Sequence, residues 1–500
     1  MEKNYFIGLD FGTQGVRCGL TDEDGVIVAI SEQKYNTYHP APGFAEQSPA
    51  DWKARMDEAI KTCYQNAPAG TFDNVRGMAV CTTASTVIPV REDGQDLGDA
   101  ILWMDVRAAQ QAERINQTQH EILKYCGGEA SVEWMVPKMM WLRENRPDLF
   151  EQADRIVELQ DYINHVLTGN WCASVSQSTG KCNYVESMGG YNRDFFHEIG
   201  FDAFFEKANL DVIKQAQPVG TLRKELAQKY HLPDDVTVYQ GGIDAHVNVV
   251  GLGVCRPGET GVVMGSSFVH LAVVARMMFE DGIWGPYQDV IIPGQYCLEG
   301  GQISAGSITK WFIREFDVQG DNPYMVMAEE ADKIAIGCDG VVMLDYFQGN
   351  RTPYKDPLAR GVFYGLTLGH TRAHLYRAIL EGVAFGTRNI LETMENEENS
   401  IHEIRGCGGV AFNPIWMQII ADATGKPIVL TEESGNAGVL GACIIAAVGA
   451  GRYQGFEQAC KKMVHVTKVI EPNMGNYSKY TEVYGRYLEL YQSLEHMMKK

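Results

Sequence analysis

The chain has 500 residues, of which 45% are hydrophobic and 21% are charged, and this is enough for two or more hydrophobic cores. Its formal net charge of −21 argues against nucleic acid or an anionic membrane as a partner, so any phosphate must be held locally by glycine turns and a few side chains. No basic segment followed by a long apolar stretch marks a secretory signal at the N-terminus. The most apolar run, 438–449, is too short to span a bilayer and predicts a buried helix.

The 12 cysteines are scattered along the chain, with no Cys-x-x-Cys pair and no Cys/His cluster of metal-ligand spacing. In a chain with no export signal, they are expected to be reduced core residues. We therefore expect a cytoplasmic protein.

The first motif is a hairpin near the N-terminus. Residues 5–10 predict a buried strand that ends in the carboxylate of Asp10, residues 11–15 predict a tight turn, and 16–21 and 26–29 predict two further strands. A turn that contains glycine and threonine presents N–H and hydroxyl groups to an anion, and Asp10 is placed to hold Mg²⁺ through water. An ordinary hairpin without a ligand is the alternative.

A second candidate site lies in the middle of the chain. Residues 236–239 predict a strand, which leads through Gly241-Gly242 to Asp244 at the start of a helix. The glycines let the backbone come close to a ligand, and a helix N-terminus favours negative charge. Asp244 is therefore a candidate general base, and the alternative is that it only caps the helix.

The second half repeats the design of the first hairpin. Strands predicted at 260–264 and 268–273 flank the turn Gly265-Ser266-Ser267. The repetition indicates an internal duplication with a cleft between the copies, in which each turn meets the phosphates of one nucleotide. No Walker-type G-x-x-x-x-G-K-[ST] loop competes for that role.

A domain boundary is expected near 251–258, where glycines and a proline interrupt two apolar segments, and it divides the chain into domains 1–252 and 253–500. Closure around this hinge would exclude water. The last stretch, 477–500, predicts an amphipathic helix that covers either the second domain or a partner subunit, which leaves a homodimer open.

Five separated segments, in the right order, resemble motifs of the FGGY carbohydrate kinase family. They are the first phosphate motif at 10–13 with Arg17, the segment of the base at 241–244, the second phosphate motif at 265–267, the C-terminal signature at 361–366 with 374–375 and 378–381, and the adenosine-binding turn and helix at 406–413 with Trp416 and 421–422. The resemblance extends over almost the whole chain. It implies an α/β fold of two ribonuclease-H-like domains, of the actin and hexokinase type, with a cleft for nucleotide and sugar between them.

The resemblance also implies roles for individual residues. Asp244 would accept the proton of a sugar hydroxyl as its oxygen adds to the γ-phosphorus of ATP, and Asp10 and Asp244 would hold Mg²⁺. The residues expected at the nucleotide are Gly12, Thr13, Gln14, Arg17, Gly265, Ser266, Ser267, Gly306, Lys310, Gly408, Gly409 and Asn413. Asn436, Ala437, Gly438 and Gly441 would let a helix approach the adenine, and ordinary helix packing is the alternative for each of these glycines.

The sugar side resembles the pentulose kinases more than the glycerol kinases at 81–90 and 103–107. Residues 176–181 resemble the ribulokinase segment whose lysine reaches the sugar, and 298–302 the segment whose glutamate does so. The sugar contacts implied are Ala84, Lys181, Asp244 and Glu299. The expected substrate is a ketopentose of the ribulose type, with xylulose or another sugar or polyol as the alternative, and a surface location is the alternative for the lysine and the glutamate.

Residues 134–142 resemble the other signature of the family, although Met135 stands where a small or hydroxyl residue is usual. Apolar residues at helical spacing predict a helix that packs beneath the sugar site, with Lys138 reaching outward to solvent. We interpret this segment as scaffold.

Two other functions use such a fold: an actin-like or chaperone ATPase switch, and an inactive sugar sensor. Asp244 and the expected sugar contacts argue against a switch. The intact Asp10, Thr13 and Ser266-Ser267 argue against a degenerate sensor.

Overall fold

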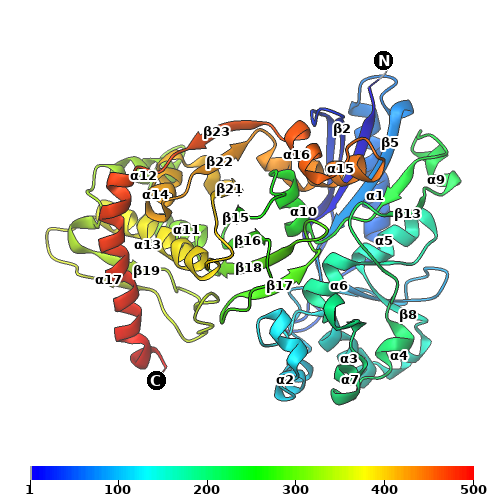
Figure 1. Cartoon of the computed structure of the whole chain (residues 1–500), viewed down its shortest axis with the longest axis horizontal. Helices are drawn as coiled ribbons and strands as arrows, with labels where there is room; N and C mark the ends of the chain where they lie inside the picture. Colours follow the sequence, from blue (N-terminus) through cyan, green and yellow to red (C-terminus); the bar gives the residue numbers. More distant parts are fainter. Residues whose placement is uncertain (1–2, 500) are drawn as a thin grey trace. The chain divides into compact units, whose positions relative to one another are not determined.

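The computed structural model describes residues 3–499, which form two compact units (Figure 1). Unit 1 contains residues 3–255, 285–297 and 436–465, and unit 2 contains 256–284, 298–435 and 466–499. The first change of unit, at Cys255, falls within the glycine- and proline-containing segment 251–258. The units are discontinuous, however, whereas the sequence suggested one boundary between 1–252 and 253–500.

Unit 1 is built on a six-stranded mixed sheet. Its strands, in spatial order, are β13 (Pro218–Thr221), β14 (Thr237–Tyr239), β5 (Val75–Thr82), β1 (Tyr5–Phe11), β2 (Gly15–Asp22) and β3 (Ile27–Lys34). β1 pairs antiparallel with β2 and parallel with β5, and β14 pairs parallel with β5. The hairpin predicted at 5–21 and the strand predicted at 236–239 are confirmed.

The second sheet has seven strands. In spatial order they are β17 (Trp284–Gln288), β18 (Tyr296–Gln302), β16 (Phe268–Val274), β15 (Glu259–Met264), β21 (Glu403–Cys407), β22 (Ile428–Thr431) and β23 (Val466–Ile470). β15 pairs antiparallel with β16 and parallel with β21, as β1 does with β2 and β5. An antiparallel edge strand closes each sheet beyond its parallel strands, β13 in the first and β23 in the second. The strand order therefore repeats from sheet to sheet, with β17 as an extra edge, as the two similar hairpins predicted.

Helices follow these strands along the chain. Those of unit 1 are α1 (Pro49–Asn66), α2 (Ala109–Gln117), α3 (Met135–Asn145), α4 (Pro147–Gln152), α5 (Leu159–Thr168), α6 (Val175–Lys181), α7 (Arg193–Glu198), α8 (Phe204–Lys207), α9 (Lys224–Lys229), α10 (Asp244–Gly251), α15 (Ala437–Gly449) and α16 (Phe456–Met463). Those of unit 2 are α11 (Gly306–Glu315), α12 (Pro323–Asp332), α13 (Arg372–Thr393), α14 (Pro414–Thr424) and α17 (Met474–Met498).

A four-stranded sheet lies beside α3 and α5, in the order β4 (Glu46–Gln47), β7 (Ala100–Ile101), β6 (Val87–Val90), β8 (Arg155–Glu158). The remaining short strands are β9 (Ala173–Ser174), β10 (Tyr184–Val185), β11 (Gly190–Tyr191), β12 (Val212–Ile213), β19 (Val342–Leu344) and β20 (Val362–Tyr364).

The buried helix predicted at 438–449 is α15, and it packs against β1, β5 and α10 within unit 1. A Cβ added to Gly441 would lie 2.0 Å from the Val247 carbonyl oxygen, and one added to Gly8 would lie 2.4 Å from the Val439 carbonyl oxygen. Both glycines are therefore needed for close packing. For Gly441 the alternative of helix packing holds, since the neighbour that it admits is α10.

Lys138 on α3 does not reach solvent, so that prediction was wrong. Its side chain is fully buried, and Nζ donates to the carbonyl oxygens of Ser85 (2.7 Å) and Leu102 (2.6 Å). Burial lowers the pKa of Lys138 to about 7. Carbonyl groups replace the water that a lysine head group usually finds at the surface.

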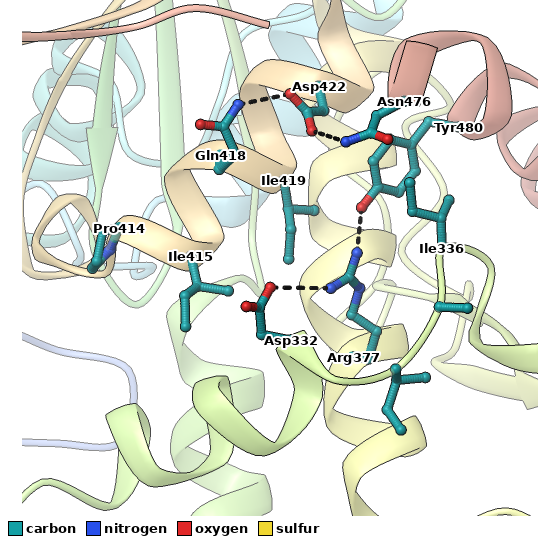
Figure 2. A pocket seen from close by; sticks show the side chains of 12 residues that line it. Asp332, Ile336, Arg377, Pro414, Ile415, Gln418, Ile419, Asp422, Asn476 and Tyr480 are labelled. Atoms are coloured by element: carbon teal, nitrogen blue, oxygen red, sulfur yellow. Dashed lines mark hydrogen bonds and ion pairs between the residues drawn. The ribbon is translucent and has the colours of Figure 1, made fainter. Parts of the chain in front are cut away.

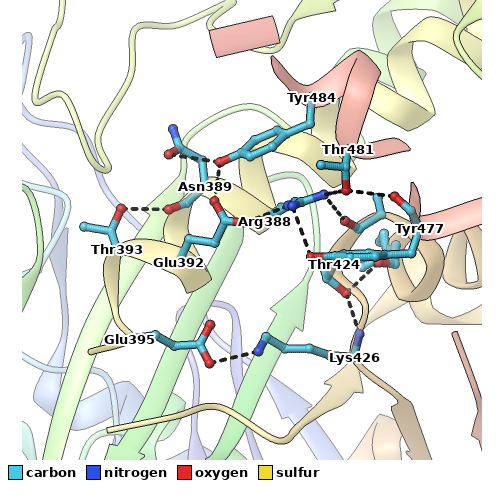
Figure 3. Close-up of polar contacts among 12 residues, drawn as sticks. Arg388, Asn389, Glu392, Thr393, Glu395, Thr424, Lys426, Tyr477, Thr481 and Tyr484 are labelled. Atoms are coloured by element: carbon cyan, nitrogen blue, oxygen red, sulfur yellow. Dashed lines mark hydrogen bonds and ion pairs between the residues drawn. The ribbon is translucent and has the colours of Figure 1, made fainter. Parts of the chain in front are cut away.

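The C-terminal helix covers its own unit. α17 lies along α13, α14 and β19, as Figure 1 shows for the red helix. Arg388 of α13 joins the three helices, because it donates to Glu392 Oε1 (2.7 Å), to the Ala423 carbonyl (3.2 Å), to Thr481 Oγ1 (3.0 Å) and to the Tyr477 hydroxyl (3.2 Å) (Figure 3). Of the two alternatives for this helix, the structure shows contact with the second unit.

All twelve cysteines are buried, and none forms a disulfide within the part of the chain that the structure describes. They are core residues, as expected. No helix among residues 3–499 is long and apolar enough to cross a membrane.

Candidate active site

The first turn, between β1 and β2, is held by side chains from outside the hairpin. The Tyr35 hydroxyl donates to the Gly12 carbonyl oxygen. Trp103 Nε1 donates to Thr13 Oγ1 (3.1 Å), and Gln47 Nε2 donates to the Thr13 carbonyl oxygen (2.8 Å). Gly12 and Thr13 were predicted from sequence, whereas Tyr35, Gln47 and Trp103 were missed as supports of the turn because nothing in their local sequence relates them to it.

Asp10, beside this turn, is a buried carboxylate with one nearby cation. It is 7% exposed, its Oδ1 accepts from Cys81 Sγ (3.4 Å), and its Oδ2 lies 3.9 Å from Arg17 Nη1. Burial raises the pKa of Asp10, and the Arg17 charge opposes that rise. A Cβ on Gly438 would lie 2.6 Å from Asp10 Oδ2, so this glycine makes room for the carboxylate.

Asp244 is the first residue of α10, and its Oδ1 accepts from the neighbouring Ala245 N–H (2.7 Å). The N-cap position belongs to Ile243, so Asp244 does not cap the helix in the usual way. Burial first, and then the negative charge of Asp10, raise the pKa of Asp244 to about 7. A carboxyl with that pKa suits general-base chemistry near neutral pH.

The two glycines before Asp244 serve packing. A Cβ on Gly241 would lie 1.8 Å from the Val80 carbonyl oxygen, and one on Gly242 would lie 2.8 Å from Ser176 Cβ. The Ser176 hydroxyl also accepts from Ile243 N–H (3.1 Å). These glycines therefore admit β5 and α6, which fix the base segment from two sides. Their expected approach to a ligand stays a prediction.

The segment that contains Ala84 lies beside both earlier motifs. Thr83 N–H donates to the Phe11 carbonyl (2.9 Å), and Thr82 N–H donates to the Gly242 carbonyl (3.1 Å). Ala84 itself is 9% exposed. The end of β1, the base segment and the expected sugar segment thus form one continuous wall within unit 1.

Lys181 ends α6 in the same unit. Its Nζ lies 6.0 Å from the ring centroid of Trp134 and 6.0 Å from that of Tyr287. Its positive charge lowers the pKa of Asp244, against the effect of burial. The Lys181 charge therefore acts on Asp244, and both of these predicted sugar contacts belong to unit 1.

The second turn, between β15 and β16, is held by backbone groups. At the start of α11, Ala305 N–H and Ser307 N–H both donate to the Ser266 carbonyl oxygen (3.0 Å each), and Gly306 N–H donates to the Gly265 carbonyl oxygen (3.2 Å). A Cβ on Gly306 would lie 2.4 Å from that Gly265 oxygen. Glycine at this position is therefore required for the helix to meet the turn.

A cavity of about 330 Å³ lies beside this turn in unit 2. It is lined by Gly265, Ser266, Gly306, Lys310, Gly409 and Asn413, all predicted at the nucleotide, and by Thr309, Tyr324, Tyr376, Val410 and Trp416. Sequence reasoning missed Tyr324 and Tyr376, which α12 and α13 contribute. A concave site with aromatic walls and a few polar groups is typical of a cofactor pocket.

Two other predicted nucleotide residues of unit 2, Gly408 and Ser267, do not line the cavity, and Asn413 lines it and also caps a helix. Gly408 has φ 95°, and its missing Cβ would lie 2.5 Å from the Met264 carbonyl oxygen, so it shapes the turn that leads to the cavity. Asn413 Oδ1 accepts from Trp416 N–H (3.1 Å) and caps α14. Ser267 is exposed and does not line the cavity.

A larger cavity of about 450 Å³ in unit 2 is lined by none of the residues expected at the nucleotide, although Asp422, at the end of the expected adenosine-binding helix, lines it. Arg377 and Asp422, two of its charged groups, have partners among the other lining residues, as Figure 2 shows. Arg377 Nη2 donates to the Tyr480 hydroxyl (2.7 Å), and Asp422 accepts from Gln418 (2.7 Å) and Asn476 (2.8 Å). Size alone therefore does not identify the site, and the smaller cavity holds the motif residues.

Glu299, on β18, is 7% exposed and belongs to unit 2. Its Oε1 accepts from Arg351 Nη2 (3.3 Å), and the Arg351 guanidinium stacks on the Trp284 ring at 3.7 Å. Sequence reasoning missed Arg351, because its only signal is a distant partner. Glu299 is not an ordinary surface residue, but its convergence with Lys181 and Asp244 stays a prediction.

Asp10 and Asp244 are also the residues expected at Mg²⁺. Within residues 3–499, no group of three or more His, Cys, Asp or Glu side chains could hold a metal ion. Mg²⁺ is usually bound through one or two carboxylates, with water and substrate phosphates completing its coordination. The pair fits that chemistry, because the charge of Asp10 raises the pKa of Asp244 and a divalent cation would relieve this repulsion.

Comparison with known proteins agrees with this geometry. Residues 5–251 match the N-terminal domain, and residues 261–450 the C-terminal domain, of the FGGY family of carbohydrate kinases. An FGGY carbohydrate kinase domain-containing protein of Xenopus laevis is 31% identical over 98% of this chain and 96% of its own length. A ribulokinase of Bacillus licheniformis is 31% identical over 90% of this chain and 87% of its own.

The fold is that of a solved xylulose kinase from Rhodospirillum rubrum, with a TM-score of 0.90 at 23% identity over 99% of this chain and 100% of the other. The α/β architecture with two mixed sheets, predicted as a pair of ribonuclease-H-like domains, is thereby confirmed. The chain belongs to the FGGY family of carbohydrate kinases.

Proposed function

We propose that this kinase transfers the γ-phosphoryl group of ATP to a hydroxyl of a ketopentose of the ribulose type. The observation that carries the proposal is Asp244, a carboxyl with its pKa raised to about 7, fixed between β5 and α6 and close to the charge of Lys181. The ribulokinase relative supports the choice of sugar. We therefore propose a ribulose-type substrate, with xylulose and other sugars or polyols as the alternatives.

The reaction follows from the groups present. A sugar hydroxyl is a weak nucleophile, so Asp244 accepts its proton while the oxygen bonds to the γ-phosphorus and the bond to the β-phosphate oxygen breaks, releasing ADP. The cavity beside Gly265 and Gly409 would hold the adenosine, and the two turns would hold the phosphates. Mg²⁺ bound at Asp10 and Asp244 would neutralise phosphate charge.

A coupled ADP-release assay tests the proposal with ribulose, xylulose, other ketoses, polyols and glycerol as acceptors. The expected result is the highest kcat/KM for a ribulose. A preference for glycerol would overturn the choice of sugar and leave the kinase assignment intact. ADP release that no acceptor stimulates would favour an ATPase switch, and no release at all would favour an inactive sensor.

Lys181→Ala and Glu299→Ala refine the sugar assignment. Loss of a charged hydrogen-bond partner costs about 1.5–3 kcal/mol, so each variant is expected to raise the sugar KM about 10-fold or more and to leave the ATP KM nearly unchanged. The effect should be much smaller with a poor acceptor that never used the contact. An unchanged sugar KM in both variants would contradict the assignment of Lys181 and Glu299 as contacts of a ribulose-type sugar.

A further inference from the structure

Two buried ionisable residues outside the proposed catalytic groups hold the segment Thr83–Thr86. Lys138 is fully buried, and its Nζ donates to the carbonyl oxygens of Ser85 (2.7 Å) and Leu102 (2.6 Å). Glu158 is 3% exposed, and its Oε2 accepts from Thr86 N–H (3.0 Å). The two side chains therefore bind the two polar groups of one peptide, the C=O of Ser85 and the N–H of Thr86.

The held segment has a strained backbone. Ser85 has φ 58°, in the left-handed region that residues with a side chain seldom adopt. Such a conformation persists only where the surroundings enforce it. Lys138 and Glu158 supply that enforcement, since each bonds a main-chain atom of Ser85 or of the residue that follows it.

The segment is also tied to the proposed chemistry. It contains Ala84, the expected sugar contact. Thr82 N–H donates to the Gly242 carbonyl (3.1 Å), just before Asp244, and Thr83 N–H donates to the Phe11 carbonyl (2.9 Å). A shift of this backbone would therefore disturb the sugar wall of unit 1, whereas the residues that line the nucleotide cavity all belong to unit 2.

We propose that Lys138 and Glu158 are positioning residues for the sugar, which hold Thr83–Thr86 in the conformation that the ketose requires. Burying an ammonium and a carboxyl costs free energy that apolar side chains of similar size would avoid. A purely structural role gives little reason for that choice. The need to orient one peptide for a ligand is a specific reason to bury both groups.

This inference rests on the proposed function and deepens it for the same site. Its test compares Lys138→Met with wild-type protein in the kinase assay. The expected result is a sugar KM raised about 10-fold or more, because a buried donor to two carbonyls is lost, with an ATP KM within about twofold of wild type. Lys207→Met is the matched control, since Lys207 Nζ donates to a main-chain carbonyl in the same unit but outside Thr83–Thr86, that of Ala153 (2.6 Å), and it should leave both KM values unchanged.

Ser85→Gly in the Lys138→Met background separates positioning from general support. Glycine adopts positive φ without strain, so the double variant is expected to recover part of the sugar KM. A structural role alone would lower the unfolding temperature and the active fraction, but would leave the sugar KM of the folded protein unchanged and unresponsive to Ser85→Gly. Where Lys138→Met does not fold, the nearly isosteric Glu158→Gln carries the same measurement, with a smaller rise in sugar KM expected.

Wild-type turnover on the acceptor panel is measured first. Absence of turnover contradicts the proposed function. Normal wild-type turnover, with an unchanged sugar KM in folded Lys138→Met or, in its place, Glu158→Gln, contradicts the positioning role alone.

Discussion

The two hairpin turns have the same topology but are held in different ways. In the first, side chains from outside the hairpin bond the main chain, whereas in the second the backbone N–H groups at the start of α11 bond it. Asp10 lies one residue before the last paired position of β1, and the corresponding residue of β15 is Val263. The repeated strand order thus supplies two turns that we propose for phosphate binding, and of the two matching positions only that of the first hairpin carries a carboxylate.

This difference suggests a division of labour. Unit 1 contains the carboxylate pair Asp10 and Asp244, together with Ala84 and Lys181, and so has the groups for sugar chemistry. Unit 2 contains the aromatic-walled cavity beside Gly265, with the groups for a nucleotide. Of the expected sugar contacts, Glu299 alone belongs to unit 2. The division therefore applies to the reacting groups and the nucleotide cavity, and the sugar contacts come from both units.

Replacing the base is expected to have the largest effect. Asp244→Asn removes the proton acceptor and should lower kcat about 10²- to 10⁴-fold, while ATP binding by calorimetry stays close to wild type. Near-normal turnover in this variant would show that the base lies elsewhere.

Replacing the carboxylate of the first turn ranks second. Asp10→Asn is expected to lower kcat about 10²-fold and to raise the Mg²⁺ concentration needed for half-maximal rate, because a charged group near the phosphates is lost. Val263→Ala, at the matching position of the second turn, serves as the control and should leave the Mg²⁺ titration unchanged. An equal shift in both variants, or in neither, would break the comparison of the two turns.

Filling the nucleotide cavity should have an intermediate effect. A Cβ on Gly409 meets nothing within 4 Å, so Gly409→Val should fold normally and place its side chain in the cavity. Overpacking costs about 1–3 kcal/mol, which corresponds to a rise of about 5- to 150-fold in the ATP KM, with the sugar KM little changed. Gly485→Val, on the outer part of α17 where a Cβ also meets nothing within 4 Å, is the control. A larger change in sugar than in ATP binding would reverse the assignment of the units.

The last expected effect is on stability, not on activity, and it depends on pH. Burial raises the pKa of Asp244 to about 7 in the folded protein, from 3.8 for an ordinary aspartate, so the folded state loses stability as the pH rises between those values. In metal-free protein, Asp244→Asn should therefore gain stability relative to wild type across this window, by at most about 1.4 kcal/mol for each pH unit, and the gain should level off above pH 7. Denaturant unfolding of both proteins at pH 5, 6, 7 and 8 measures it, and a difference that does not vary with pH would show that the pKa is not raised.

Much of this structure follows from local sequence. Both hairpins, the strand before Gly241 and the buried helix α15 were predicted, because alternation, turn residues and apolar runs act over a few residues. The positions of Gly265, Gly306, Gly409 and Asn413 around one cavity followed from a resemblance in motif order.

What sequence did not predict depends on contacts between distant segments. α15 packs in unit 1 although it follows β22 in the chain, since Gly441 fits against α10. Lys138 is buried because two carbonyls far from it in sequence accept its hydrogen bonds, whereas a lysine on an amphipathic helix usually faces water. Arg351 likewise has no local signature, and only the folded chain shows its pairing with Glu299.

Hydrogen–deuterium exchange with one ligand at a time tests the division between the units most directly. ADP alone is expected to slow exchange most in peptides that cover 265–267, 306–310 and 409–413, and the preferred ketopentose alone most in peptides that cover 82–86, 176–181 and 242–246. Protection of the first set of peptides by the ketopentose and of the second by ADP, or protection of only one unit by both ligands, would contradict the division between the units.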